Sequence, residues 1–362
     1  MKILVTILII ILGVFGLYNF QRNKNLNLSL PINVPTVSDG LEGDLDSVKI
    51  IAEGFDTPWE IVFISNSELL ITERFGRVSK VNIKDGSKVI LSDLPKVKEI
   101  GEGGLLGMAL DPNFKSNSFI YFYYTYSGDE SKTMNRVVKM KYSNNTLSGE
   151  EIVVDSIPGA PNHNGGRIRF GPDGNLYITT GDAQEPSRAQ DKNSLAGKIL
   201  RVVSGKVEMY SYGHRNPQGI AWDKDGNLWA TEHGKSGIAS GLDELNKIVA
   251  GNNYGWPEIE GSETRDGMIT PVVNSGSNDT WAPAGTTFLN GSLFWGGLRG
   301  QALYEGVIEG ENVSLKQHFK NEFGRIRAVV TGPDNAIYIT TSNKDGRGIP
   351  KDGDDKIIRI RI

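Results

Sequence analysis

The stretch that decides the fold is GPDGNLYITTGD, at residues 171–182. The same pattern returns as DKDGNLWATEHG at residues 223–234 and as GPDNAIYITTSN at residues 332–343. Each copy begins with an Asp/Asn/Gly turn, because Asn and Gly accept the positive φ that tight turns need, and continues as a strand of aromatic and β-branched residues. Strand units that recur at long, roughly regular intervals are typical of a radial β array, above all a β-propeller. In a propeller, the polar ends of these strands converge on one face around the axis.

We therefore predict an all-β fold, a six-bladed β-propeller, because each blade needs about four strands. The predicted blades contain residues 61–81, 105–126, 167–203, 219–246, 284–304 and 325–343. The final strand, residues 356–360, has no following partner, so we expect it to pair with the blade near residues 48–81 and to remove an exposed edge. Outside the N-terminal leader no stretch has sustained helical periodicity, which predicts only short helical insertions.

The chain divides into three predicted parts. Residues 1–20 carry Lys2 before an apolar run from Ile3 to Leu17, which predicts either a secretory signal peptide or an uncleaved membrane anchor. Residues 21–47 are rich in Asn, Ser, Pro and Gly and are predicted to be a flexible linker. Residues 48–362 form the predicted propeller. We expect an extracytoplasmic monomer, either secreted, periplasmic or tethered to the outer face of the membrane through an uncleaved leader.

Composition excludes several kinds of chemistry. The net charge of -4 argues against a nucleic-acid partner, which would need a basic face. The absence of cysteine excludes disulfides, thiolate metal sites and a cysteine nucleophile. The four histidines are too few for a multi-histidine metal cluster unless they converge.

Polar islands interrupt the strands at the predicted inner ends of blades. Residues 162–167, NHNGGR, place glycines beside a histidine and an arginine, which would allow a ligand to approach the backbone. Arg325 and Arg327 lie on one face of a strand because their spacing is two residues. Arginines that converge on a pocket indicate an anionic ligand, since guanidinium groups bind carboxylates in a bidentate manner. The alternatives stay open: a loop histidine can be structural, and the two arginines can form a surface pair.

Six motifs then occur in a characteristic order. They are GEGGLLG at 101–107, DPNF at 111–114, His163-x-x-Gly166-Arg167, GHRNPQG at 213–219, DELN at 243–246 and NYGWP at 253–257. Together they resemble the soluble quinoprotein glucose and aldose sugar dehydrogenases, the glucose/sorbosone dehydrogenase family. The resemblance extends from about Gly54 to the C-terminus.

The resemblance implies a six-bladed propeller that holds pyrroloquinoline quinone over its axis together with calcium. His163 would be the general base that takes the proton from the anomeric hydroxyl of the sugar, with Arg215 beside the quinone oxygens. The implied cofactor-binding residues are Glu102, Arg215, Asn216, His233, Arg299, Arg325 and Arg327. The implied metal ligands are the carbonyls of Gly234 and Lys235 for the cofactor's calcium, and Glu244 with the Tyr254 carbonyl for a second, structural calcium.

Two departures from the family pattern lie beside the predicted base. Glu102 stands where the sugar dehydrogenases often carry glutamine, and a carboxylate near an anionic cofactor is unfavourable unless it is protonated, paired or turned away. Asn162 stands where the glucose enzymes carry an aspartate before the base. An acidic partner can orient the imidazole and stabilise its charged form, whereas an amide can orient it but adds no charge.

The predicted function is oxidation of the anomeric carbon of an aldose to a lactone. Electrons would leave to an external acceptor, since the chain has no Cys-x-x-Cys-His haem motif. One alternative is a non-catalytic propeller that binds or interacts with a partner. Another is a calcium-dependent, lactonase-like hydrolase, which would place Asp, Glu and Asn ligands on the axis where this chain has arginines.

Overall fold

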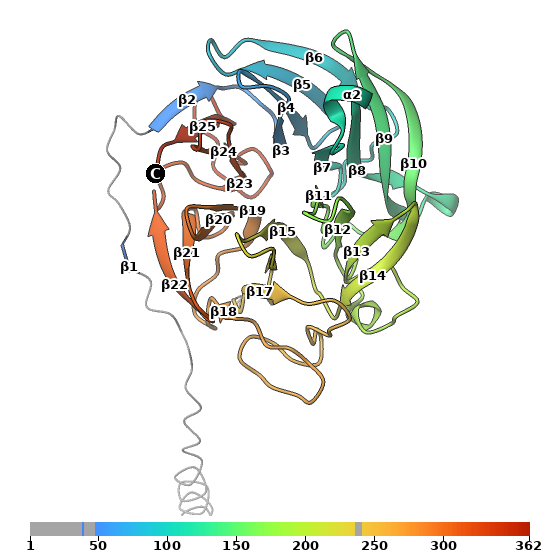
Figure 1. Cartoon of the computed structure of the whole chain (residues 1–362), viewed down its shortest axis with the longest axis vertical. Coiled ribbons are helices and arrows are strands. Elements are labelled where there is room, and N and C mark those ends of the chain that lie inside the picture. The colour runs from blue at the N-terminus through green and yellow to red at the C-terminus, as the bar shows by residue number, and fades with distance from the viewer. Residues whose placement is uncertain (1–37, 40–47, 236–240) are drawn as a thin grey trace, which may run out of the picture. The chain divides into compact units, whose positions relative to one another are not determined.

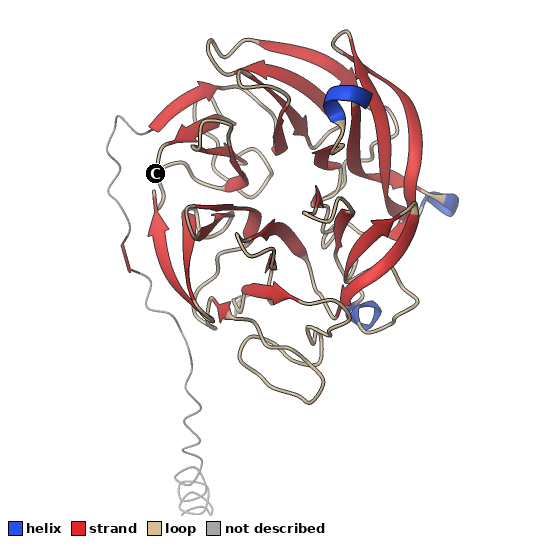
Figure 2. Ribbon diagram, viewed as in Figure 1, coloured by secondary structure: helices blue, strands red, loops and turns tan. Residues whose placement is uncertain are grey.

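Six β-sheets surround a common centre in the part of the chain that the structure describes (Figures 1 and 2). This computed structural model describes residues 38–39, 48–235 and 241–362. The predicted leader, residues 1–20, and most of the predicted linker, residues 21–47, lie outside the described residues. The predicted six-bladed propeller is confirmed.

Five blades follow the chain in order, each starting with its inner strand. They are built from β3 (Pro58–Phe63), β4 (Glu68–Glu73), β5 (Arg77–Asn82) and β6 (Lys88–Asp93); β7 (Leu105–Leu110), β8 (Phe119–Ser127), β9 (Thr133–Ser143) and β10 (Thr146–Pro158); β11 (Ile168–Phe170), β12 (Leu176–Thr180), β13 (Lys198–Val203) and β14 (Lys206–Tyr212); β15 (Pro217–Trp222), β16 (Leu228–Glu232), β17 (Glu244–Ile248) and β18 (Val273–Asn274); and β19 (Pro283–Leu289), β20 (Ser292–Gly297), β21 (Leu303–Glu309) and β22 (Asn312–His318). The short strand β1 (Ser38–Asp39) adds to β22 in parallel.

The sixth blade closes the ring. It consists of β23 (Ile326–Thr331), β24 (Ile337–Thr341), β25 (Ile357–Ile360) and, as its outer strand, β2 (Val48–Ala52). β25 pairs with β2 in antiparallel register, with Val48 opposite Ile360. The predicted closure by the last strand is therefore confirmed, and it joins the two ends of the propeller in one sheet.

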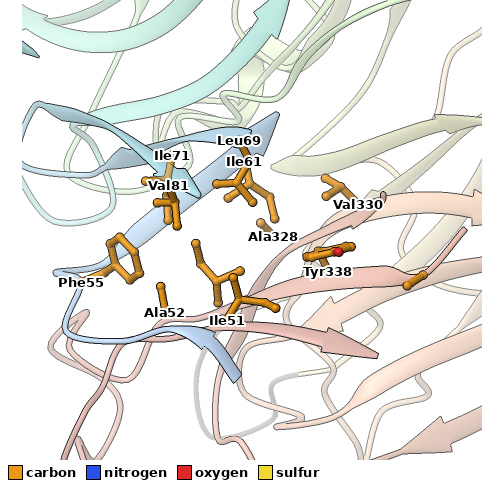
Figure 3. Packing of buried hydrophobic residues seen from close by; sticks show 12 residues of the cluster. Ile51, Ala52, Phe55, Ile61, Leu69, Ile71, Val81, Ala328, Val330 and Tyr338 are labelled. Atoms are coloured by element: carbon orange, nitrogen blue, oxygen red, sulfur yellow. The ribbon is translucent and has the colours of Figure 1, made fainter. Parts of the chain in front are cut away.

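A hydrophobic cluster seals this closure against the first blade (Figure 3). Ile51 and Ala52 of β2 and the nearby Phe55 pack into the same cluster as side chains from β3, β4 and β5 and from the inner strands of the closing blade. Leu69, Ile71 and their neighbours in this cluster are almost fully buried. The cluster also contains Ile357 of β25, so burial of apolar surface stabilises the ring where β2 and β25 meet through non-covalent contacts alone.

The three repeated stretches occupy equivalent places, since each forms the second strand of a blade: β12, β16 and β24. In the middle copy, Asp223 accepts hydrogen bonds from the backbone N–H of Asn227 and from Nε1 of Trp229, both at 2.9 Å. Gly226 has a φ of 80°, which explains the glycine in the turn. The turn aspartate thus fixes the turn and also binds the aromatic side chain of the strand that follows it.

Helices are short in the described part of the chain (Figure 2). They are α2 (Phe114–Asn117), η2 (Asp129–Ser131) and η3 (Pro186–Ala189). None of the described helices has the length and apolar character that crossing a membrane requires.

Candidate active site

A cavity of about 620 Å³ brings together most of the predicted site residues from loops that are far apart in the sequence. Its lining includes the predicted residues Glu102, His163, Arg215, His233, Gly234, Lys235, Arg299 and Arg325. It also includes Asn162, Gln184, Asp243, Thr280, Ala282, Leu298 and Arg347. The polar islands that interrupt the strands therefore form one site.

His163 lies in the loop between β10 and β11 and has a φ of 60°. The backbone of Gly181 packs closely against His163. A Cβ added to Gly181 would lie 2.0 Å from the carbonyl oxygen of His163. Gly165 is equally constrained, because its Cβ would lie 2.6 Å from the carbonyl oxygen of Thr179. The absence of a side chain at Gly165 is therefore required by the close packing of strand β12 against this loop.

Asp182 is the acidic partner of His163, and the sequence analysis assigned it no role. Its Oδ1 lies 2.8 Å from Nδ1 of His163, and its Oδ2 accepts a hydrogen bond of 2.9 Å from Nε1 of Trp256. Asp182 is fully buried, and the backbone N–H of Gln184 also donates to Oδ1 at 2.8 Å. A carboxylate that accepts from Nδ1–H leaves Nε2 of the imidazole with its lone pair, which is the form of a general base. Asp182 is the last residue of the first repeat. The predicted convergence of strand ends could therefore have placed it near the cavity, but not against His163.

Glu102 is paired rather than turned away. One carboxylate oxygen accepts from the guanidinium of Arg347, and the other accepts from the backbone N–H of His163 at 3.2 Å. Burial works against the charged form, but the charges of His233 and Arg347 and the His163 N–H outweigh it and lower the pKa of Glu102 to about 2. Burial lowers the pKa of His233 to about 4, so at pH 7 Arg347 is the cation that compensates Glu102.

The predicted arginines separate into two groups. Arg299 and Arg325 line the cavity, and Nη2 of Arg325 lies 2.7 Å from Oδ2 of Asp345. Arg327 is not among the lining residues; it is buried, and its Nη1 donates to Oε1 of Gln218 at 2.7 Å. Burial lowers the pKa of Arg327 to about 9.

The cavity is cationic. Apart from its two histidines, its charged lining consists of two carboxylates, Glu102 and Asp243, and five cations. The cations are Arg215, Lys235, Arg299, Arg325 and Arg347. This excess of positive charge favours an anionic ligand.

Two buried polar atoms near Arg215 have no hydrogen-bond partner among the described residues: Nε2 of His233 and Nδ2 of Asn216. His233 lines the cavity, and Asn216 is linked to the His163 loop because its Oδ1 accepts from the N–H of Gly165 at 3.0 Å. Burying a polar atom without a partner is costly, so these atoms mark positions where a polar ligand would be favourable.

A second, much smaller cavity of about 20 Å³ contains the residues predicted for the structural calcium. Glu244 and Tyr254 line it together with Glu232, Gly234 and Lys235. Burial and the negative charge of Glu232 raise the pKa of Glu244 to about 8. The volume is enough for a single water molecule or ion. The described residues contain no group of three or more His, Asp or Glu side chains arranged to hold a metal, so a cation here would rely on carbonyl oxygens as well.

A buried row of side chains has the order of a hydrolase triad. Nε2 of His214 lies 2.8 Å from Oγ of Ser211, and its Nδ1 lies 2.9 Å from Oε2 of Glu232. All three residues are at most 3% exposed, so no substrate reaches Ser211 in this structure. Ser211 and His214 instead hold Glu232 in place. The other carboxylate oxygen of Glu232 accepts hydrogen bonds from the backbone N–H groups of Arg215 and Asn216.

Comparison with known proteins gives a consistent result. A family model described as Glucose / Sorbosone dehydrogenase matches residues 55–350. Aldose sugar dehydrogenase YliI of Escherichia coli (strain K12) is 30% identical over 341 residues, with 83% of this chain and 91% of that protein covered. Quinoprotein glucose dehydrogenase B of Acinetobacter calcoaceticus is 29% identical over 272 residues, with 64% of this chain and 56% of that protein covered.

The solved structure of the PQQ-bound form of aldose sugar dehydrogenase from Streptomyces coelicolor has the same architecture, with a TM-score of 0.81 and 36% sequence identity. The comparison covers 90% of this chain and 99% of that one. The family match spans most of the propeller and agrees with the order of the sequence motifs. The chain therefore belongs to the glucose/sorbosone dehydrogenase family.

Proposed function

We propose that the protein is a quinoprotein dehydrogenase that oxidises the anomeric carbon of an aldose to a lactone, using pyrroloquinoline quinone and calcium. The observation that carries the proposal is the His163–Asp182 pair, with 2.8 Å between Nδ1 and Oδ1, at the edge of a cationic cavity. The similarity to a PQQ-bound aldose sugar dehydrogenase and to a quinoprotein glucose dehydrogenase supports it.

The cavity residues fit an anionic, carboxylate-bearing cofactor. Arg299 and Arg325 would bind its carboxylates, while Arg215 and Asn216 would lie beside its quinone oxygens. Nε2 of His233, a cavity residue, has no partner among the described residues and would gain a hydrogen bond from it. When bound, the quinone supplies the acceptor for the hydride that leaves the anomeric carbon. Arg327 would contribute positive charge from a buried position, where Gln218 accepts a hydrogen bond from it.

The chemistry of the chain itself is proton transfer. Nε2 of His163 takes the proton of the anomeric hydroxyl while the C–H bond breaks, so that the C–O bond becomes the carbonyl of the lactone. Asp182 stabilises the imidazolium that forms, and Trp256 holds Asp182 in place through the 2.9 Å bond to Oδ2. Arg215, whose guanidinium carbon lies 5.3 Å from the ring centroid of Trp256, is placed to stabilise negative charge that develops in the cavity.

Calcium would bind at two places. Gly234 and Lys235 line the main cavity, and their carbonyls would hold the ion that assists the cofactor. Glu244 and Tyr254 line the small cavity, and the Glu244 carboxylate with the Tyr254 carbonyl would hold a structural ion. Oxygen ligands suit this hard cation.

The proposal also covers the oligomeric state, the cellular location and the electron acceptor of the enzyme. We propose that it works as a monomer outside the cytoplasm and passes electrons to an external acceptor. The apolar run in residues 1–20 of the sequence supports export or tethering.

Reconstitution tests the proposed function. The purified protein is titrated with pyrroloquinoline quinone and calcium while the cofactor's absorbance is followed, and dye reduction is then measured with a panel of aldoses. We expect stoichiometric cofactor binding and aldose-dependent dye reduction. Failure to bind the quinone would overturn the cofactor assignment. Binding without turnover on any aldose would favour the non-catalytic alternative, and hydrolysis of lactones without the quinone would favour the hydrolase.

A further inference from the structure

Arg347 links Glu102 and Asn162, two residues of the cavity lining beside the candidate base His163. It lies between β24 and β25, and its Nη1 contacts Oε1 of Glu102 while its Nη2 donates to Oδ1 of Asn162 at 2.7 Å. Glu102 and Asn162 lie on two other loops, before β7 and before β11. The second oxygen of Glu102 accepts from the backbone N–H of His163 at 3.2 Å. One guanidinium group therefore connects three loops around the candidate base.

The segment that carries Arg347 is itself fixed. The backbone N–H of Arg347 donates to Oδ1 of Asp345 at 2.9 Å, and Oδ2 of the same carboxylate accepts from Nε of Arg325 at 2.9 Å. A Cβ on Gly348 would lie 2.4 Å from the carbonyl oxygen of Asn343, so the segment packs closely on its neighbour. Arg347 is thus anchored on the side of Arg325 and reaches across the cavity edge to Glu102.

The pair has unequal exposure, which decides what each partner contributes. The side chain of Glu102 is 13% exposed, whereas that of Arg347 is 52% exposed. Removing the cation would leave a nearly buried carboxylate without its strongest partner at the edge of the cavity. Such a carboxylate either stays charged and repels an anionic ligand or takes up a proton, and both outcomes cost binding or folding free energy. The other titratable groups that interact with Glu102 are His233 and Arg215, which line the same cavity, and the buried Arg327.

We propose that Arg347 is a positioning and charge-compensating residue: it neutralises Glu102, so that a cavity with a carboxylate in place of an amide still binds an anionic cofactor, and it holds the loop of His163. This inference rests on the proposed function. In this chain Glu102 and Arg347 act as one unit, and Arg347 is not expected to be replaceable while Glu102 keeps its charge. Asn162 belongs to the same unit as the second acceptor of the guanidinium.

A double-mutant cycle tests the unit. The affinity for pyrroloquinoline quinone is measured by titration in the full-length protein and in Arg347→Ala, Glu102→Gln and the double variant. We expect Arg347→Ala to weaken binding by about tenfold or more, because the carboxylate is left uncompensated. The double variant should return to within about threefold of the original protein, because a glutamine carbonyl still accepts from the His163 N–H and carries no charge.

Two further variants separate the effect of the charge of Arg347 from a general effect of removing an arginine. Arg347→Lys keeps the charge but cannot reach Glu102 and Asn162 through a planar fork, so it should lose less affinity than Arg347→Ala. Arg201→Ala is the matched control, since Arg201 pairs with Glu208 at 3.0 Å between β13 and β14 and is absent from the cavity lining. A double variant that binds as weakly as Arg347→Ala would overturn the inference, because Arg347 would then bind the cofactor directly. An unchanged affinity of Arg347→Ala would overturn it as well.

A second readout is independent of the cofactor. The melting temperature of the cofactor-free protein is measured for the same four proteins. Arg347→Ala should melt below the original protein, and adding Glu102→Gln should recover most of that loss. If the original protein binds no quinone, the proposed function fails, while this melting cycle still decides whether the two residues form a unit. Equal melting losses in Arg347→Ala and the double variant would refute the unit.

Discussion

Replacing Asp182 by asparagine should lower turnover by about 10²–10³-fold while cofactor affinity stays nearly unchanged. The structure shows why the change is severe although the side chain keeps its shape. Three donors point at the two carboxylate oxygens of Asp182: Nδ1–H of His163, the N–H of Gln184 and Nε1–H of Trp256. An asparagine offers one acceptor oxygen and one NH₂ group, so at least one of these donors must face another donor.

The magnitude follows from charge and hydrogen bonding. A full charge pair with centres about 4 Å apart is worth about 4 kcal/mol at an effective dielectric constant of 20, and this stabilisation of the imidazolium is lost. At about 1.4 kcal/mol per decade, that corresponds to a loss of up to about 10³-fold in rate. If the asparagine turns its NH₂ toward His163, the ring must accept at Nδ1 and carry its proton on Nε2, which abolishes the base.

The assay is steady-state dye reduction with an aldose after saturation with quinone and calcium, together with a quinone titration for affinity. Asp173→Asn is the control, because it makes the same change at the other end of the same hairpin, where Asp173 binds the turn residue Asn175. A turnover of Asp182→Asn within about fivefold of the original protein would refute the base–carboxylate reasoning.

Other expectations concern the base, the anion site, the metal and acid stability. His163→Gln should lower turnover by about 10²–10⁴-fold with quinone binding retained, measured by the same two assays. Arg325→Ala should weaken quinone binding by about 1.5–3 kcal/mol in a titration; an unchanged affinity would mean that this group is not a ligand. Chelation of calcium should lower the melting temperature of the cofactor-free protein, and Glu244→Gln should remove that shift, because a metal that binds only the folded state stabilises it. The lowered pKa of Glu102, about 2, means that its stabilisation is complete above its ordinary pKa of 4.5 and is lost as the pH falls through about 2. Between pH 4.5 and about 2, the free energy of unfolding should change with pH by up to about 3 kcal/mol less in Glu102→Gln than in the original protein. Parallel pH profiles of the two proteins would contradict the assignment.

The positions of the turns and strands could be predicted because the residues that specify each of them are close together in the sequence. The turn aspartate of each repeat binds groups within six residues, as Asp223 does with Asn227 and Trp229, so turn and strand are specified together. The closing strand could also be predicted, because an unpaired final strand leaves an edge that must be covered. The pairing of Val48 with Ile360 is the result.

The partners of the candidate base could not be predicted from the sequence. Asp182 follows His163 by 19 residues, across two strands and the turn between them, and the sequence contains no pattern that pairs them. Arg347 and Glu102 are 245 residues apart and come together because their blades flank the same cavity. Arg327 follows Arg325 by two residues, yet Arg325 precedes β23 and lines the cavity, whereas Arg327 lies within β23 and bonds to Gln218, which the spacing alone cannot indicate.

The sequence by itself determined the propeller, the family and the choice of His163 as candidate base, because repeats, turns and motifs are contiguous and each carries its own physical reason. Only the tertiary structure decided that Asp182 orients His163, that Arg347 compensates Glu102 and that Gly165 serves a strand. These properties depend on which blades are neighbours and on how closely their loops approach. They arise from hydrogen bonds and charge pairs between segments that the chain brings together only when the ring closes.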